Sequence, residues 1–446
     1  CHDQLSAHGG RRRQVELCII CHQPQTTAAS TGVTVDFKVF IHKLHMGENL
    51  PSVKAGGSYA IGSSDWSTVA FPADIRRCET CHDQKSGATQ AANYLTKPSR
   101  AACGSCHDDV NFATGENHNN LPQVSDAQCS TCHAAQSNAE FDASIKGAHV
   151  IPRFAKELPG TVFDVISVAD SSPGKKPTVT FSVKDKAGKP ILPNEMTRLT
   201  LVLAGPTTDF GNAISEDART AKGDNGTYTY TFTAAIPADA KGSFSVGIEG
   251  YRNQTIQKGT KHEQVIRDAG TNKVLTVAVT DSKPVPRRTV VTLAKCNACH
   301  ASLSLHGDNR NAIEQCVLCH NPTASDSAQR PTAENPAQSI DFRSMIHKIH
   351  TGKELSEPYI IYGFGGSKNS FNEVGFPGKR NNCSTCHVNG SEQLPLPATS
   401  AKVVNARGPI PLMGPETAAC TGCHTSLAAN SSGSTFQSSI FALPSR

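Results

Sequence analysis

The 446-residue sequence is short of methionine, of long apolar runs and of spare cysteines. With only four methionines, thioether ligation could serve few metal sites. No stretch reaches the roughly 18 apolar residues of a membrane-spanning helix. No signal peptide is present, and we expect the N-terminus to be incomplete. All 17 cysteines belong to one recurring pattern, which leaves none for a disulfide, a catalytic thiol or a separate metal site.

The recurring pattern is Cys-x-x-Cys-His, which occurs complete eight times, while the chain opens on Cys1-His2 as the tail of a ninth copy. This spacing is the attachment signature of c-type haem, in which two thiols bond to the haem and the adjacent imidazole binds its iron. Zinc ribbons also pair cysteines, but they do not require histidine after every second one. We therefore predict nine haem attachment sites. Their cysteines are Cys1, Cys18, Cys21, Cys78, Cys81, Cys103, Cys106, Cys129, Cys132, Cys296, Cys299, Cys316, Cys319, Cys383, Cys386, Cys420 and Cys423.

The 18 histidines divide into two equal sets, which predicts two imidazoles for each iron. A lone histidine is more often a surface or core residue than a ligand. Here, however, the number of extra histidines equals the number of predicted attachment sites. The predicted proximal ligands, each following a cysteine, are His2, His22, His82, His107, His133, His300, His320, His387 and His424. The predicted distal ligands are His8, His42, His45, His118, His149, His262, His306, His347 and His350.

The first and last thirds of the chain are copies of each other. The segment 1–9 matches 299–307, and Ile-His-Lys-x-His occurs at 41–45 and again at 346–350. Cys1 is therefore read as a haem cysteine rather than as a lipid-modified N-terminus. The first copy has a fifth motif at Cys129, and the fifth motif of the second copy would fall beyond Arg446. We expect two five-haem modules, with ten haems in the parent protein.

Between the copies the composition changes, because residues from about 161 to 280 contain no cysteine and a single histidine. Apolar residues alternate with threonine and serine, as at Val179, Phe181 and Val183. Such period-two runs, separated by glycine-rich turns, predict a Greek-key sandwich or a split barrel. The expected organisation is a pentahaem module at 1–155, an all-β domain at 156–285 and a second pentahaem module at 286–446. The haem modules are expected to be irregular with short helices, and the β domain to be a spacer.

The spacing of the extra histidines predicts how they are shared. His42 and His45 lie three apart on one face of a predicted helix over 37–47, and a second helix over 343–352 repeats this arrangement. Axial ligands lie on opposite sides of a haem, so each helix must reach two different haems. His8 and His306 follow an attachment histidine too closely to bind the same iron without strain, and we expect each to ligate a neighbouring haem.

Three classes of function are compatible with many haems. Iron with two imidazoles has no vacant position for a substrate, which favours an electron conduit over a catalytic reductase of a small oxyanion. Such a reductase needs one open haem site, often marked by lysine in place of the final histidine, and all nine motifs end in histidine. A structural or adhesive surface protein would not need so many haems. We predict an electron-transfer protein, at most a non-specific terminal metal reductase, and not a specific enzyme.

The chain resembles the outer-membrane decahaem cytochromes of metal-reducing bacteria, the MtrC/OmcA family. The resemblance rests on the five-plus-five motifs, the β domain between them and the duplicated Ile-His-Lys-x-His. It implies haems in a staggered cross, on the extracellular face of a Gram-negative outer membrane. It also implies electron transfer from a porin–cytochrome complex or other cytochromes to iron or manganese oxides, metal chelates and flavins. Many members carry a cysteine pair in a β domain that is linked to flavin binding, and this β domain has none.

The formal charge of +5 does not indicate a nucleic-acid or anionic membrane partner. The propionates and the ferric irons of nine haems together would bring the total to roughly −4 in the oxidised state. Basic runs such as Arg11–Arg13 are therefore expected to face solvent or propionates. Because haem of this type is attached outside the cytoplasm, we also expect the protein to be exported.

Overall fold

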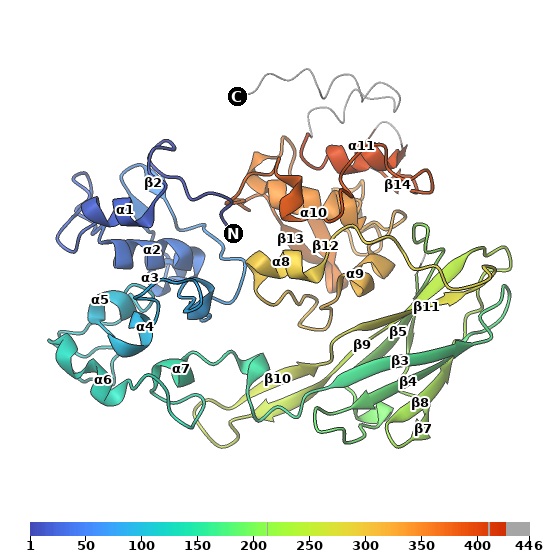
Figure 1. Cartoon of the computed structure of the whole chain (residues 1–446), viewed down its shortest axis with the longest axis horizontal. Coiled ribbons are helices and arrows are strands. Elements are labelled where there is room, and N and C mark those ends of the chain that lie inside the picture. The colour runs from blue at the N-terminus through green and yellow to red at the C-terminus, as the bar shows by residue number, and fades with distance from the viewer. Residues whose placement is uncertain (212, 409–410, 425–446) are drawn as a thin grey trace. The chain divides into compact units, whose positions relative to one another are not determined.

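The computed structural model describes residues 1–211, 213–408 and 411–424, and the chain divides into two compact units (Figure 1). The first unit contains Cys1–Lys156 with the short segments Ala298–Ala301 and Pro377–Lys379. The second contains the remainder, and so combines the predicted β domain with most of the predicted second haem module. The division into three domains at 155/156 and 285/286 stays a prediction.

The first unit consists of short helices joined by turns. Its polypeptide has little apolar core, because Leu50, Tyr59 and Ala91 are its only buried hydrophobic residues before residue 155. A chain of this length with so few buried side chains needs another source of stability, such as bound cofactors. Its elements are α1 (Val15–Cys21), α2 (Phe37–Met46), α3 (Pro51–Lys54), α4 (Asn93–Thr96), α5 (Arg100–Cys103), α6 (Cys129–Cys132), α7 (Ile145–Ala148), β1 (Ala60–Ile61) and β2 (Ser64–Asp65).

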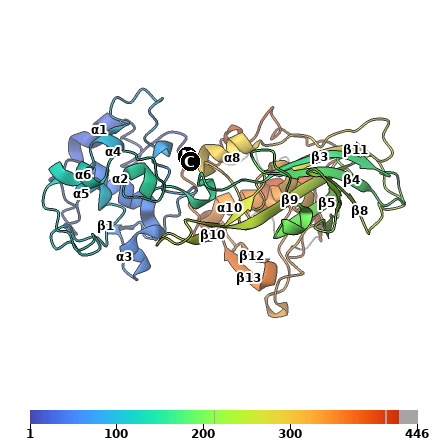
Figure 2. The ribbon, with the colours of Figure 1, turned by 90° about the horizontal axis from the view of Figure 1, so that it is seen from below.

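The part of the second unit that carries the cysteine motifs is likewise built from short helices and turns. Its elements are α9 (Ile313–Cys319), α10 (Phe342–Thr351), α11 (Pro415–Cys420), β12 (Ile360–Gly363), β13 (Ser367–Ser370), β14 (Val403–Val404) and β15 (Leu412–Met413). Helix α8 (Leu293–His300) begins in the second unit and ends in the segment Ala298–Ala301 of the first. Seen from below in Figure 2, the hairpin β12–β13 projects beside α10. Among the described residues, no helix has both the length and the apolar character needed to span a membrane.

The two longest helices of the haem modules, α2 and α10, are copies with the same end signals. Asp36 and Asp341 each cap an N-terminus by accepting a hydrogen bond from a backbone N–H of the first turn. The chain leaves each helix through a glycine with positive φ, 43° at Gly47 and 49° at Gly352. The structure thus confirms two short helices close to the predicted ranges, which fixes the direction of the histidines that they carry.

The β domain is a sandwich of two antiparallel sheets. One sheet has the order β3-β4-β8-β7, and the other has β10-β9-β5-β6 with β11 also paired to β9. In Figures 1 and 2, β9 is the long strand of the domain, and β10 and β11 pair with successive halves of its length. The strands are β3 (Val162–Ala169), β4 (Thr178–Lys184), β5 (Arg198–Ala204), β6 (Ile214–Asp217), β7 (Lys222–Asp224), β8 (Thr227–Thr231), β9 (Ser243–Ile256), β10 (Gln264–Ala269) and β11 (Lys273–Ala278).

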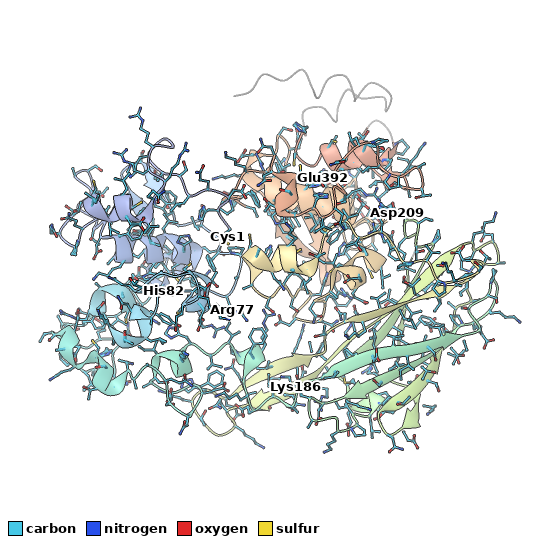
Figure 3. The ribbon with its side chains drawn as sticks, in the orientation of Figure 1. Cys1, Arg77, His82, Lys186, Asp209 and Glu392 are labelled. Carbon is cyan, nitrogen blue, oxygen red and sulfur yellow. The ribbon has the colours of Figure 1, made fainter. Side chains whose placement is uncertain are left out.

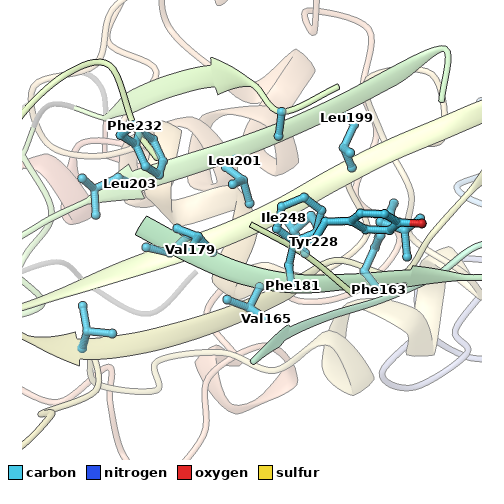
Figure 4. Packing of buried hydrophobic residues seen from close by; sticks show 14 of the residues in the cluster. Phe163, Val165, Val179, Phe181, Leu199, Leu201, Leu203, Tyr228, Phe232 and Ile248 are labelled. Carbon is cyan, nitrogen blue, oxygen red and sulfur yellow. The ribbon is translucent and has the colours of Figure 1, made fainter. Parts of the chain in front are cut away.

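Alternating side chains from both sheets form the core of the sandwich (Figure 4). On β4 the predicted alternation is observed directly, because Val179, Phe181 and Val183 are fully buried. Leu201 on β5 and Ile248 on β9 meet them from the other sheet and are also fully buried. The predicted fold class, an all-β sandwich accompanied by irregular haem modules with short helices, is confirmed.

The outer face of the second sheet is also covered. A second apolar cluster joins Val202 and Ala204 of β5 to Ile313, Val317 and Leu318 of α9. The close approach depends on Gly247 in β9, since a Cβ there would collide with the side chains of Gln315 and Leu318. The first half of β9 is therefore buried on both faces, with the sandwich core on one side and the haem module on the other.

Candidate haem-binding sites

Each complete Cys-x-x-Cys-His motif lies at the end of a short helix or in a single 3-10 turn. In the seven motifs outside helix α8 the histidine N–H donates to the carbonyl oxygen of the first cysteine, at 2.8–3.0 Å, and the motif Cys296–His300 lies within that helix. This turn places the two thiols on one side, because residues three apart share a helical face. All 17 cysteines have free thiols. The local structure therefore offers pairs of adjacent thiols next to an imidazole, as haem attachment requires.

The structure brings seven attachment histidines next to seven of the predicted distal histidines. A metal held between two imidazoles, with metal–nitrogen bonds of about 2 Å, separates the two ring centres by about 6 Å. The observed separations are 5.9–6.3 Å, so the pairs have the spacing that one iron needs. The pairs are His2–His45, His8–His22, His42–His82, His107–His149, His118–His133, His306–His320 and His347–His387.

In each of the seven pairs the distal histidine lies beside a motif other than the one that directly precedes it in the sequence. On α2, His42 faces His82 (labelled in Figure 3), whereas His45 faces His2. The two histidines of one helix thus serve two different motifs. His8 lies beside His22, the histidine of the next motif, and not beside His2.

The second copy repeats two of these relationships. His306 lies beside His320 with ring centres 6.0 Å apart, and His347 lies beside His387 at the same separation. Equivalent histidines therefore pair in both copies of the repeat, although the residues around them differ between the copies. His118 and His149, which have no counterpart in the described part of the second copy, face His133 and His107.

For the four remaining predicted ligands, the structure gives the position in the chain or a local contact. The Nδ1 atom of His300 lies 2.9 Å from the carbonyl oxygen of Pro72, and that of His350 lies 2.9 Å from the carbonyl oxygen of Ile346. His424 follows α11, at the end of the described chain. His262 is exposed in the turn between β9 and β10, and its assignment as a ligand stays a prediction. The expected fifth motif of the second copy lies outside the described residues.

Backbone carbonyls orient six of the fourteen paired rings through Nδ1. When Nδ1–H donates to such an acceptor, the ring is held in place and Nε2 is left to bind a metal. The bonds are His22 to Val35, His45 to Ile41, His118 to Leu121, His133 to Ala143, His149 to Ile145 and His320 to Ile340, all at 2.7–2.9 Å. His387 uses the hydroxyl oxygen of Ser391 instead, at 3.1 Å. By contrast, the buried Nδ1 atoms of His42 and His347 make no hydrogen bond of ordinary geometry.

Burial favours the neutral form of some of these side chains. It lowers the pKa of His306 to about 4 and of His347 to about 4. It raises the pKa of the thiols, to about 11 at Cys78 and about 12 at Cys316. Neutral imidazole is the form that ligates iron, so burial favours binding at the histidines.

Two buried carboxylates near these sites escaped the sequence analysis. Asp209 (labelled in Figure 3) accepts from Arg343 at 2.6 Å and Arg287 at 3.3 Å, and Glu249 accepts from Arg310 at 2.7 Å. Both come from the β domain, and their arginine partners come from later in the chain. Glu249 interrupts an otherwise apolar run in β9, which is the only sequence signal that it has a buried partner.

Cysteine motifs that recur through the chain, together with imidazoles paired at metal-binding distance, define a multihaem c-type cytochrome. A family model described as "Outer membrane cytochrome MtrC/MtrF-like, domains II/IV" matches residues 1–146 and 288–443. The chain belongs to this family. The match leaves out the whole β domain, which separates the two matched segments in the sequence.

Two relatives are similar in sequence over part of their length. The multiheme cytochrome MtrC of Shewanella baltica is 29% identical over 143 residues, which are 32% of this chain and 18% of that protein. The high-molecular-weight cytochrome c of Nitratidesulfovibrio vulgaris is 25% identical over 167 residues, which are 36% of this chain and 28% of that protein. The aligned segments thus cover less than a third of either relative.

Two solved structures share the fold. The crystal structure of MtrC from Shewanella baltica matches with a TM-score of 0.63 at 19% identity, covering 95% of this chain and 67% of the other. The crystal structure of the outer membrane decaheme cytochrome OmcA matches with a TM-score of 0.68 at 19% identity, covering 96% and 67%. The likeness extends across the β domain that the family model leaves out.

Proposed function

We propose that this chain conducts electrons, which enter at one haem and leave from another. The observation that supports this most strongly is the set of seven imidazole pairs with ring centres 5.9–6.3 Å apart. Each pair would hold one haem iron between two imidazoles, and an iron held in this way would have no free position for a substrate. A site of this kind is suited to gain and lose an electron without binding anything else.

The residues proposed to hold haem are the 17 motif cysteines, the nine histidines that follow them and the nine other histidines. Bound haem supplies a reversible one-electron couple at its iron. The paired histidines orient this group from both sides, and the backbone carbonyls fix the rings through Nδ1. His262, His300, His350 and His424 are proposed ligands on the sequence pattern. We propose ten haems in the parent protein, nine of them attached to residues of this chain.

The α2 helix shows how the chain keeps such sites close together. Because His42 and His45 lie three residues apart on one helix and serve different motifs, the two haems that they bind must be neighbours. The α10 helix carries His347 and His350 in the same way. Short separations favour electron transfer, so the duplicated helix is proposed as the element that sets the distance between haems.

The proposed partners and location follow the family. We propose that the protein lies on the extracellular side of the outer membrane, receives electrons from other cytochromes or a porin–cytochrome complex, and passes them to metal oxides, metal chelates or flavins. We propose no specific enzyme activity, although non-specific metal reduction at an end haem would accompany this role. The alternative, a reductase of a small oxyanion, needs an open haem site.

Haem quantitation with absorbance and low-temperature EPR spectra tests this proposal on the intact chain. The expected result is about nine haems per chain, nearly all low-spin with two imidazole ligands, and no change when carbon monoxide or nitrite is added. A high-spin haem that binds either ligand would overturn the conduit and support the reductase. Far fewer haems than motifs would overturn the assignment of the attachment sites.

A further inference from the structure

Glu249 of β9 is the most completely enclosed carboxylate near a pair of predicted haem ligands. Its side chain is 0% exposed. Both of its oxygens accept from Arg310, at 2.7 Å each. Gln315 donates at 3.0 Å and Asn309 at 3.3 Å, while Arg198 donates from the neighbouring strand at 3.1 Å. A buried carboxylate that meets two guanidinium groups and two amides stays ionised.

The partners of Glu249 belong to the segment that carries both ligands of one site. Asn309 and Arg310 follow His306 within four residues, and Gln315 lies on α9, which leads to His320. The rings of His306 and His320 are 6.0 Å apart. The β domain therefore holds, through one carboxylate, the loop and the helix between these two histidines.

The charges of this cluster also act on the site itself. Besides burial, Arg310 lowers the pKa of His306, and Glu249 acts in the opposite direction. The two charges also act with opposite sign on the thiol of Cys319, since Arg310 works to lower its pKa and Glu249 to raise it. Charges that influence a ligand and a thioether cysteine will also influence the charge on an iron between them.

The first copy of the repeat provides an internal comparison, because the residues equivalent to Arg310 and to the buried positions of α9 are exposed there. Arg12 corresponds to Arg310, and its side chain is exposed. The counterparts of α9 residues are exposed as well: Val15, Leu17 and Ile20 on α1 are 47%, 44% and 62% exposed. Their equivalents Ile313, Gln315 and Leu318 are 7%, 1% and 0% exposed. The two copies share a ligand pair but differ in what surrounds it.

We propose that Glu249 is a positioning residue that lowers the reduction potential of the haem held by His306 and His320. Its carboxylate compensates Arg310 and Arg198, and so stabilises the extra positive charge of the ferric state. The β domain is then more than a spacer, because it sets the electron affinity of one site in the second haem module. The inference rests on the proposed function, since it requires a haem between these two histidines.

Removing the negative charge of Glu249 and removing the positive charge of Arg310 should shift the potential in opposite directions. A merely structural role would not have this effect. In Glu249→Gln the site gains net positive charge, and the potential of a single haem is expected to rise. In Arg310→Gln the site loses positive charge, and the potential of the same haem is expected to fall. The double variant restores the net charge and is expected to titrate close to the unmodified protein. If Glu249→Gln does not accumulate, Arg310→Gln and the double variant test the same point.

The measurement is a potentiometric titration of the intact haem-loaded chain, followed by haem absorbance and EPR. Two controls match the variants: Glu314→Gln changes an exposed carboxylate on the same helix, and Arg12→Gln changes the exposed counterpart of Arg310. Neither control is expected to move the titration of the His306–His320 haem, because exposed charges are screened. Shifts of the same sign in Glu249→Gln and Arg310→Gln, or no shift in either, would overturn the inference.

The same samples separate failure of the inference from failure of the proposed function. If the unmodified protein lacks low-spin haem at the expected content, the haem assignment itself is wrong. If the haem content and the low-spin signals are normal in every variant but the potentials do not move, only the role of Glu249 is wrong.

Discussion

The rings of His347 and His387 are stacked, with centres 6.0 Å apart and planes inclined by 19°. One ring comes from the middle of α10, and the other follows the 3-10 turn Cys383–Thr385. In the first copy the counterparts His42 and His82 have nearly the same spacing, 6.1 Å, with planes inclined by 34°. A geometry that recurs in two copies with different neighbours is a property of the repeat, and it makes the distal residue a direct target for mutation.

Replacing His347 by glycine is expected to open one haem and leave the rest unchanged. The iron held by His387 would lose its second imidazole and become high-spin, with a site that binds carbon monoxide. Absorbance and EPR spectra would show one high-spin haem per chain, and His42→Gly should do the same for the His82 site. Lys353→Ala, at an exposed position just after α10, is the control. Unchanged spectra in His347→Gly would show that the pair does not share an iron.

Ser391 contacts Nδ1 of His387 through its side chain, whereas six other paired histidines meet a backbone carbonyl at this atom. Its hydroxyl oxygen lies 3.1 Å from Nδ1 of His387, and its O–H donates to the carbonyl of Val290 at 2.7 Å. Ser391→Ala is therefore expected to weaken the ligand and raise the potential of one haem. It should also lower the free energy of unfolding by about 1 kcal/mol.

The control for this variant is Ser400→Ala. The hydroxyl of Ser400 is buried and makes no hydrogen bond, so its removal should cost little stability and leave every potential in place. If Ser391→Ala and Ser400→Ala titrate identically, the hydroxyl of Ser391 has no influence on His387.

Much of the site could be predicted from the sequence because its chemistry is local. The Cys-x-x-Cys-His turn is made by neighbouring residues, and the two histidines of α2 share a face through helical geometry alone. The sandwich was also predictable, since alternation along β4 reports burial at Val179 and Phe181 directly. The end signals of α2 and α10, an aspartate and a glycine, are local in the same way.

The pairing of distal histidines with motifs could not be predicted in full. His118 and His149 lie outside the repeat, and only the folding of intervening loops places them beside His133 and His107. The link between Glu249 and Arg310 depends on a contact between distant segments. It also depends on Gly247, whose missing side chain allows α9 to approach the sheet. Such tertiary contacts have no periodicity to read from a single sequence.

The glycines that end α2 and α10 are expected to tolerate no side chain. A Cβ at Gly47 would collide with the backbone carbonyl of Val69, and a Cβ at Gly352 with that of Val374. Both also have positive φ, which costs an alanine roughly 1–2 kcal/mol by itself. Gly47→Ala and Gly352→Ala should therefore lower the free energy of unfolding by more than this amount, measured by denaturant titration.

A matched control separates the collision from the backbone conformation. Gly56 also has positive φ, at 92°, but a Cβ there would meet nothing within 4 Å. Gly56→Ala should therefore show the conformational cost alone. Equal losses at Gly56 and Gly47 would mean that the carbonyl of Val69 moves aside without cost.

The cluster around Asp209 predicts a loss of stability at low pH. Burial alone would raise the pKa of Asp209, but Arg343 and the N–H of Ala401 outweigh it and hold the pKa below its usual range. The carboxylate therefore stabilises the folded state above the unfolded pKa of about 4. This stabilisation is lost as the pH falls through the lower folded value, because the folded state must then take up a proton.

Asp209→Asn removes this titration and leaves three half-buried arginines without their shared anion, Arg287, Arg288 and Arg343. The free energy of unfolding at neutral pH is expected to fall by about 3–5 kcal/mol, and its dependence on pH below about 4 to become shallower. Asp217→Asn is the control, because its pair with Arg219 is exposed to solvent and should contribute little to stability. A steep acid dependence that survives in Asp209→Asn would place the responsible carboxylate elsewhere.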